Sequence, residues 1–254
     1  MRYFLYFSYC GINYHGWQRQ PNGVSVQQVI EEAMSVLMQE DVMLTAAGRT
    51  DAGVHACLMV AHFDTQKQIL SETNLIGRLN NFLPKDIAVK DIRRVQDSAH
   101  ARFDAVERTY EYRCVFSKDP FRHALVTQIP SNLDFSLMNE AAEILTHTED
   151  FASFCKLHTD VKTTICKVSR AEWTVDERGA VFTITADRFL RNMVRAVVGT
   201  LFEIGRHRMT VEQFGEVISK HHRTAAGQSA PADGLYLVDI KYPPEVFWQK
   251  VPLN

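Results

Sequence analysis

The chain carries the same order of strand and helix signals in its two halves. In the first half, hydrophobic patterning and turn residues predict strands at 2–9, 43–47, 58–64 and 87–93, and helices at 25–38 and 71–82. In the second half they predict strands at 108–115, 166–175, 180–186 and 235–242, and helices at 133–145, 189–204 and 211–221. The shared order of β-α-β-β-α-β predicts an α+β fold built from two split βαβ units.

We therefore expect two ferredoxin-like halves, 1–104 and 105–254, whose antiparallel sheets join into one extended sheet. No residue-level repeat accompanies the repeated order. With helices on one face only, the opposite face is expected to be open and to hold the active-site cleft. An open sheet face with aromatic side chains is a common RNA-binding surface.

Two segments show the local signals most clearly. Ser25 and Gln28 have the spacing of a capping box, which predicts a helix start. Apolar residues then follow at helical spacing and predict one buried stripe: Val26, Val29, Ile30, Ala33, Met34, Leu37 and Met38. On the strand at 108–115, the two-residue period places Tyr110, Tyr112 and Cys114 on one face.

Composition narrows the class of protein. The 254 residues carry a formal net charge of −2, which excludes a strongly basic nucleic-acid-coating protein but allows a local basic groove. The five cysteines are scattered without a CxxC pair, so neither a disulfide framework nor a four-cysteine zinc site fits. The first residues do not resemble a secretory signal, and no apolar run reaches the length of a membrane span. We expect a cytoplasmic protein without a membrane partner.

The loop GRTDAGVHA, at residues 48–56, combines a guanidinium, a hydroxyl, a carboxylate and an imidazole. One interpretation is a turn in which Asp51 caps a backbone N–H and Arg49 points into solvent. The other is a carboxylate presented for catalysis between two strands, with Arg49 keeping it ionised and oriented. Composition alone favours the turn.

Five stretches, in order along the chain, resemble the tRNA pseudouridine synthase A family. Besides GRTDAGVHA they are YCGINYHGWQRQPNGVSVQ, HARFDAVERTYEYR, FLRNMVRAVVG and GQSAPADGLYLVDIKYP. Two positions depart from the family pattern: Cys10, where an acidic residue is expected, and Ser229, where threonine is commoner. Neither is a proposed catalytic group.

The resemblance implies an isomerase that converts uridine to pseudouridine at positions 38–40 of the tRNA anticodon stem-loop. It implies Asp51 as the nucleophile, Arg49 and Arg195 as its cationic neighbours, and Tyr110 as the active-site tyrosine that lies against the base and relays a proton. Whether Asp51 attacks C1′, adds at C6 or assists a glycal route is left open. Without the resemblance, Tyr110 would be interpreted as a core aromatic.

The residues expected to contact the substrate are Tyr110, Arg191, His55, Arg102 and Gln18. On the helix expected at 189–204, Arg191 and Arg195 would share one row, because they are four residues apart. Such a run of arginines is otherwise typical of a solvated helix face.

No cofactor or metal is expected. The reaction oxidises nothing and brings in no group, and the sequence has no GxGxxG, GxxxxGK[ST] or HExxH motif and no zinc-spaced Cys/His pairs. The resemblance also implies a homodimer with tRNA crossing both subunits. Two alternatives remain: an RNA-binding module that uses the same sheet without chemistry, and an enzyme of the same fold that modifies another RNA.

Overall fold

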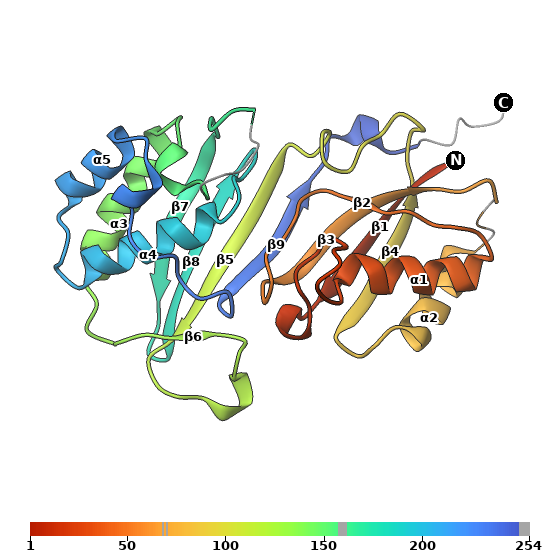
Figure 1. The fold of residues 1–254 in the computed structure, drawn as a ribbon, viewed down its shortest axis with the longest axis horizontal. Helices are drawn as coiled ribbons and strands as arrows, with labels where there is room; N and C mark the ends of the chain where they lie inside the picture. The colour runs from red at the N-terminus through yellow and green to blue at the C-terminus, as the bar shows by residue number, and fades with distance from the viewer. Residues whose placement is uncertain (68, 70, 157–161, 249–254) are drawn as a thin grey trace. The chain divides into compact units, whose positions relative to one another are not determined.

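The computed structural model describes residues 1–67, 69, 71–156 and 162–248 (Figure 1). The chain divides into two compact units. The first consists of Met1–Val106 and the residues from Leu237 onward, and the second of Glu107–Tyr236.

The first unit is a sheet of mostly antiparallel strands with two helices. Its strand order is β4-β1-β3-β9, with the short β2 paired to β3. The strands are β1 (Arg2–Tyr9), β2 (Thr45–Ala46), β3 (His55–Asp64), β4 (Ile87–Arg94) and β9 (Leu235–Lys241, of which the last five residues belong to this unit). The helices are α1 (Val26–Met38) and α2 (Glu72–Phe82), which lie over this sheet in Figure 1.

The second unit has the strand order β5-β8-β7, all antiparallel, with the short β6 running parallel to β5. Its strands are β5 (Glu107–Val115), β6 (Thr127–Gln128), β7 (Val168–Val175) and β8 (Gly179–Ala186). Its helices are α3 (Phe135–Ile144), α4 (Met193–Gly205) and α5 (Val211–Ser219). The expected α+β class, with mainly antiparallel strands, is confirmed.

Helix α1 begins where the sequence predicts. The Ser25 hydroxyl accepts a hydrogen bond from the backbone N–H of Gln28 at 3.2 Å and so satisfies one of the exposed amides of the first turn. The other half of the capping box does not form, because the Gln28 side chain donates to Glu32 instead. The buried residues of α1 include five of the expected stripe: Val26, Ile30, Ala33, Met34 and Met38.

Aromatic side chains form the core of the second unit. Trp173 on β7 lies 5.1 Å from Phe182 on β8 and 5.7 Å from Phe202 on α4, measured between ring centroids. Tyr112 on β5 contacts Phe202 edge-on. Tyr110, Tyr112 and Cys114 are all buried on one face of β5, as the alternation predicts. That face is therefore the one that α4 covers.

In the first unit, the face of the sheet opposite to α1 and α2 is partly covered. Phe4 alternates with Tyr3 and Leu5 on β1 and is fully buried, because the ring of Tyr242 packs on it at 4.9 Å. His62, its partner on β3, is buried and accepts a hydrogen bond from the N–H of Ala101. The expectation of an open face is wrong at this point, because the segment around residues 99–104 and Tyr242 close it.

The helix expected at 189–204 begins later. Asn192 adopts a left-handed conformation, with φ of 65°, and α4 starts at Met193. Arg191 therefore precedes the helix, and the expected helical row of Arg191 and Arg195 is wrong. Of the helices in the described part of the chain, none is long and apolar enough to cross a membrane.

Candidate active site

The loop that carries Asp51 connects β2 to β3. The backbone oxygen of Asp51 accepts a hydrogen bond from the N–H of Val54 at 3.2 Å, which closes a turn, and Gly53 supplies the positive φ of 79° that the turn needs. Arg49 is exposed and Asp51 is partly buried. Asp51 thus lies, partly exposed, at the start of a short turn whose backbone is fixed by a hydrogen bond.

Thr50, directly before Asp51, is the point at which the loop is attached to the rest of the unit. Its hydroxyl lies 2.7 Å from the phenol oxygen of Tyr9, and its backbone oxygen accepts a hydrogen bond from the N–H of Trp17 at 3.1 Å. The ring of Trp17 stacks on Phe7 of β1 at 5.3 Å. The backbone next to Asp51 is thereby bonded to two rigid parts of the unit.

Two glycines let the segment at residues 11–17 approach the loop closely. Gly16 has φ of +85°, and a Cβ atom there would lie 2.5 Å from the backbone oxygen of Thr50. A Cβ on Gly11 would lie 2.0 Å from the backbone oxygen of Val54. Neither distance is compatible with a side chain, so both glycines are required by backbone-to-backbone packing.

His55 lies beneath the loop. Its side chain is 1% exposed, and its Nδ1 accepts a hydrogen bond from the N–H of Gly11 at 3.1 Å. The buried imidazole thus bonds to the glycine segment that packs against the loop. The expected substrate contact by His55 stays a prediction.

The other two expected contacts of the first unit lie in different places. Gln18 is exposed and follows Trp17, so it borders the Asp51 loop. Arg102 is exposed near the residue 101 amide that bonds to His62, seven residues along β3 from His55. At the rise of an extended strand this separation is roughly 20 Å, so Arg102 is remote from the loop.

Tyr110 lies on β5 in the second unit with 9% of its surface exposed. Its ring meets that of Phe189 edge-on, with centroids 5.0 Å apart. Because Tyr110 shares the face of Tyr112, it lies on the side of β5 that α4 covers. There it contacts Phe189, a residue of the segment that precedes the helix. The cleft is expected on the opposite side.

Arg195 and Arg191 differ in their surroundings. The Nε of Arg195 donates to the backbone oxygen of Ala230 at 2.7 Å, and the Arg195 backbone oxygen accepts from the N–H of Ala230. The first bond orients the partly buried guanidinium at its Nε, and the second joins the backbone of α4 to that of Ala230. Arg191 is exposed, and its backbone oxygen accepts a hydrogen bond from the N–H of Lys156.

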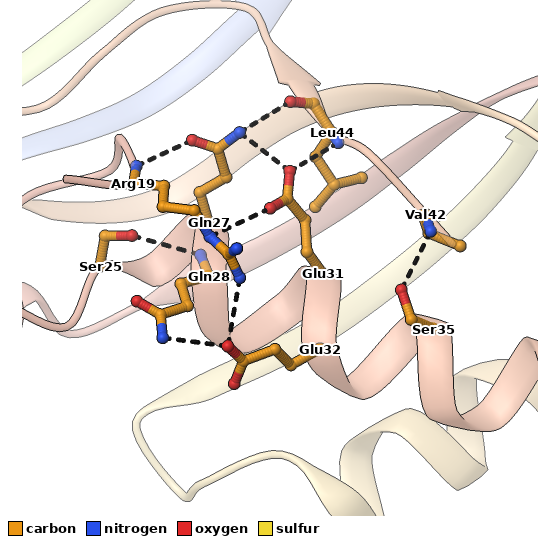
Figure 2. Close-up of polar contacts among 9 residues, drawn as sticks. All are labelled: Arg19, Ser25, Gln27, Gln28, Glu31, Glu32, Ser35, Val42 and Leu44. Carbon is orange, nitrogen blue, oxygen red and sulfur yellow. Dashed lines mark hydrogen bonds and ion pairs between the residues drawn. The ribbon is translucent and has the colours of Figure 1, made fainter. Parts of the chain in front are cut away.

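The sequence reasoning missed a polar cluster centred on Gln27 and Glu31 of α1 (Figure 2). One available signal is the place of an acidic residue between Ile30 and Met34, two residues of the buried stripe. A second signal is the four-residue spacing of Gln27 and Glu31, which brings their side chains together on one helix face.

The described residues offer no set of side chains that could bind a metal ion. No group of three or more His, Cys, Asp or Glu side chains in the ranges given above is arranged to hold a metal ion. Among the titratable groups, burial raises the pKa of Cys114, Tyr112 and Tyr14 and lowers that of His62 to about 4.

Comparison with known proteins gives a consistent result. Residues 6–104 and 141–243 match a family described as tRNA pseudouridine synthase. A protein named tRNA pseudouridine synthase A from Parabacteroides distasonis is 55% identical over 97% of this chain and 98% of its own length. Proteins of the same name from Bacteroides fragilis and Acinetobacter baylyi are 53% and 38% identical, over 97% and 100% of this chain and 98% and 94% of their own lengths.

Proposed function

Since the chain belongs to the tRNA pseudouridine synthase family and is an isomerase that acts on tRNA, we propose that it modifies uridines 38–40 of the anticodon stem-loop, with Asp51 as the nucleophile. One observation carries the assignment of Asp51. Its carboxylate stands on a turn whose preceding residue, Thr50, is bonded through both its side chain and its backbone to rigid parts of the unit. Such a fixed backbone suits a group that must meet a reacting carbon within a few tenths of an ångström.

The reaction sets the demands on the side chains. The N1–C1′ glycosidic bond breaks, the uracil turns, and a C5–C1′ bond forms while the C5 proton leaves and N1 regains a proton. The number of electrons and the atoms of the nucleotide are conserved, so the enzyme has to supply only a nucleophile or anion beside the sugar and a path for a proton. Asp51 fills the first role in this proposal, and the hydroxyl of Tyr110 the second.

In this proposal the cationic residues orient the Asp51 carboxylate and bind the RNA. We assign Arg195 as the ion-pair partner that holds the Asp51 carboxylate in its anionic, correctly turned form, and this assignment draws support from the bond that anchors the Arg195 Nε to the Ala230 oxygen. Arg49, exposed two residues before Asp51, would help to keep the Asp51 carboxylate ionised and oriented. Gln18 would contact the nucleotide at the loop, while Arg102 and Arg191 would contact phosphates farther along the RNA.

The target uridine must leave its stack to reach Asp51. A single subunit with a net charge of −2 offers a limited basic surface, so we also propose a homodimer in which one tRNA contacts both subunits. The substrate is a cellular tRNA, and the proposed location is the cytoplasm.

The decisive experiment is single-turnover pseudouridine formation by Asp51→Asn, with enzyme in excess over an unmodified tRNA transcript. The amide keeps the shape of the side chain but is too weak a nucleophile, so the variant should bind tRNA and form no pseudouridine. If Asp51 only caps the turn, asparagine should cap nearly as well, and activity should survive with a stability loss of about 1 kcal/mol or less.

Mapping the product by position tests the rest of the proposal. Pseudouridine at 38, 39 or 40 of wild-type-treated tRNA supports the anticodon assignment, whereas product confined to another arm contradicts it. Tight tRNA binding without any product from the wild type would favour a binding module.

A further inference from the structure

Helix α1 carries a buried carboxylate, that of Glu31. Glu31 is 4% exposed, and its helix neighbours Ile30 and Met34 are buried as well. Its Oε1 accepts hydrogen bonds from the backbone N–H of Leu44 and from the Gln27 amide, both at 2.9 Å. Its Oε2 lies 3.7 Å from the Nε of Arg19. One side chain thus contacts two segments that are separate in sequence (Figure 2).

Gln27 connects the same two segments. Its Oε1 accepts a hydrogen bond from the backbone N–H of Arg19 at 2.9 Å, and its Nε2 donates to the backbone oxygen of Leu44 at 3.1 Å. Its own backbone N–H donates to the oxygen of Trp17. Together, Gln27 and Glu31 bond to the backbone of Arg19 and to both polar backbone atoms of Leu44.

Both segments lead directly to the catalytic loop. From Leu44 the chain enters β2, where Ala46 pairs with Ala61 of β3, and then passes into the loop at residue 47. From Arg19 it runs back two residues to Trp17, whose N–H bonds to the backbone oxygen of Thr50. The Gln27–Glu31 pair therefore fixes the entry of the Asp51 loop and the segment that packs on it.

Burial of a carboxylate is costly, and an apolar side chain of the same size would often be at least as stable here. The retained charge accordingly needs a purpose other than stability. We propose that Glu31 and Gln27 are positioning residues that hold the Asp51 loop in its reactive geometry. This inference rests on the proposed function of Asp51 and extends it to two residues that do not touch the substrate.

The neighbouring Glu32 provides a matched control. It is the next residue on α1, it is exposed, and its Oε1 accepts hydrogen bonds from Arg19 Nη2 at 3.1 Å and from Gln28 at 3.0 Å. Replacing Glu32 with glutamine removes the same charge and so one ion pair of Arg19, but leaves the bonds to Leu44 intact. It separates a general effect of charge from an effect on the loop.

The test compares single-turnover rates at saturating enzyme for Glu31→Met, Glu31→Gln and Glu32→Gln. Methionine keeps the volume and removes both acceptors, so the rate should fall by about tenfold, the scale expected for a small displacement of a catalytic group. Glutamine keeps one oxygen acceptor for Leu44 and should restore most of the rate, and Glu32→Gln should react at the wild-type rate. The Kd for tRNA should stay within about twofold in all three, because the change acts on chemistry.

A merely structural role gives a different pattern. Glu31→Met would then unfold at a lower urea concentration than the wild type, yet the folded enzyme would react at the wild-type rate. This result would overturn the inference. The proposed function would still stand if Asp51→Asn were inactive. If Glu31→Met does not fold, Gln27→Leu carries the same expectation, because it removes the bonds to Arg19 and to the Leu44 oxygen at a partly exposed position. A wild-type rate in folded Gln27→Leu would equally overturn it. If the wild type forms no pseudouridine, the proposed function fails first.

Discussion

The phenol oxygen of Tyr9 lies 2.7 Å from the hydroxyl oxygen of Thr50, and both side chains are buried. Tyr9 is the last residue of β1, and Thr50 precedes the residue proposed as the nucleophile. This bond joins the rigid sheet to the loop that has to present a carboxylate accurately.

Tyr9→Phe should therefore lower both stability and rate. The ring stays, but the Thr50 hydroxyl no longer bonds to a phenol oxygen, at a cost of about 1 kcal/mol in the free energy of unfolding measured by urea titration. The single-turnover rate should fall as well, because the backbone before Asp51 is released on one side. A rate equal to that of the wild type, with the stability loss present, would show that the Trp17–Thr50 bond alone suffices to position the loop.

Gly16→Ala should be far more damaging than an ordinary glycine substitution. The positive φ of +85° is unfavourable for alanine, and the new Cβ would lie 2.5 Å from the Thr50 oxygen, so the backbone must move at the catalytic loop. We expect at least about 1 kcal/mol of lost stability and a large decrease in the single-turnover rate. Gly77→Ala on α2 is the control: its Cβ meets nothing within 4 Å, and it should be neutral or stabilising.

Local signals predicted the elements well where the cause of the structure is itself local. The Ser25 cap starts α1, and the alternation on β5 gives the buried face, because both depend on neighbouring residues. The start of α4 was misplaced because the left-handed conformation of Asn192 has no sequence signal comparable to glycine. Strand β3 begins at His55, ahead of the expected residue 58, because a tertiary bond from Gly11 fixes its first residue.

The residues of the candidate site also fall into those that local sequence predicts and those that depend on the fold. Asp51 could be named from its motif, since the motif is one contiguous run of residues. The supports of that loop could not, because Tyr9, Trp17 and Glu31 reach it only through the fold. His55 could be named from the same motif, but its burial and its bond to the backbone of Gly11 depend on the fold.

Arg191→Ala should weaken tRNA binding without changing the chemistry. Its exposed guanidinium precedes α4, and removing one cation that binds a phosphate should flatten the slope of log Kd against log salt by about one unit. The measurement is a tRNA binding titration at several salt concentrations, with the single-turnover rate at saturating enzyme as a check. An unaltered slope would place Arg191 on a solvated surface away from the RNA.

Acid should destabilise the first unit through His62. Burial, with Arg2 and His100 nearby, lowers the pKa of His62 to about 4 from 6.5, while Asp64 and Asp104 oppose the shift. Between these values the unfolded chain binds a proton that the folded chain does not, so the free energy of unfolding must decrease as the pH falls from about 6.5 to about 4.

The variant His62→Asn tests this dependence, because an amide oxygen can still accept the hydrogen bond from Ala101 but does not titrate. Urea unfolding between pH 4 and 7 should show a shallower pH dependence than the wild type. The exposed His147, changed to asparagine, should leave the wild-type dependence intact. Parallel curves for wild type and His62→Asn would exclude His62 as the source.

A proton relay by the Tyr110 hydroxyl and packing by its ring give different outcomes when the residue is changed. Tyr110→Phe keeps the edge-on contact with Phe189 and removes only the hydroxyl, so binding should be normal and the single-turnover rate should fall by about a hundredfold if the hydroxyl transfers a proton. Tyr110→Leu removes the ring as well and should also weaken tRNA binding. Tyr112→Phe, on the same face of β5, is the control: its hydroxyl bonds to Thr127 and to the Pro231 oxygen, so it should lose about 1 kcal/mol of stability and keep the rate. A wild-type rate in Tyr110→Phe would leave contact with the base as the only role of Tyr110, because the ring is then all that the reaction uses.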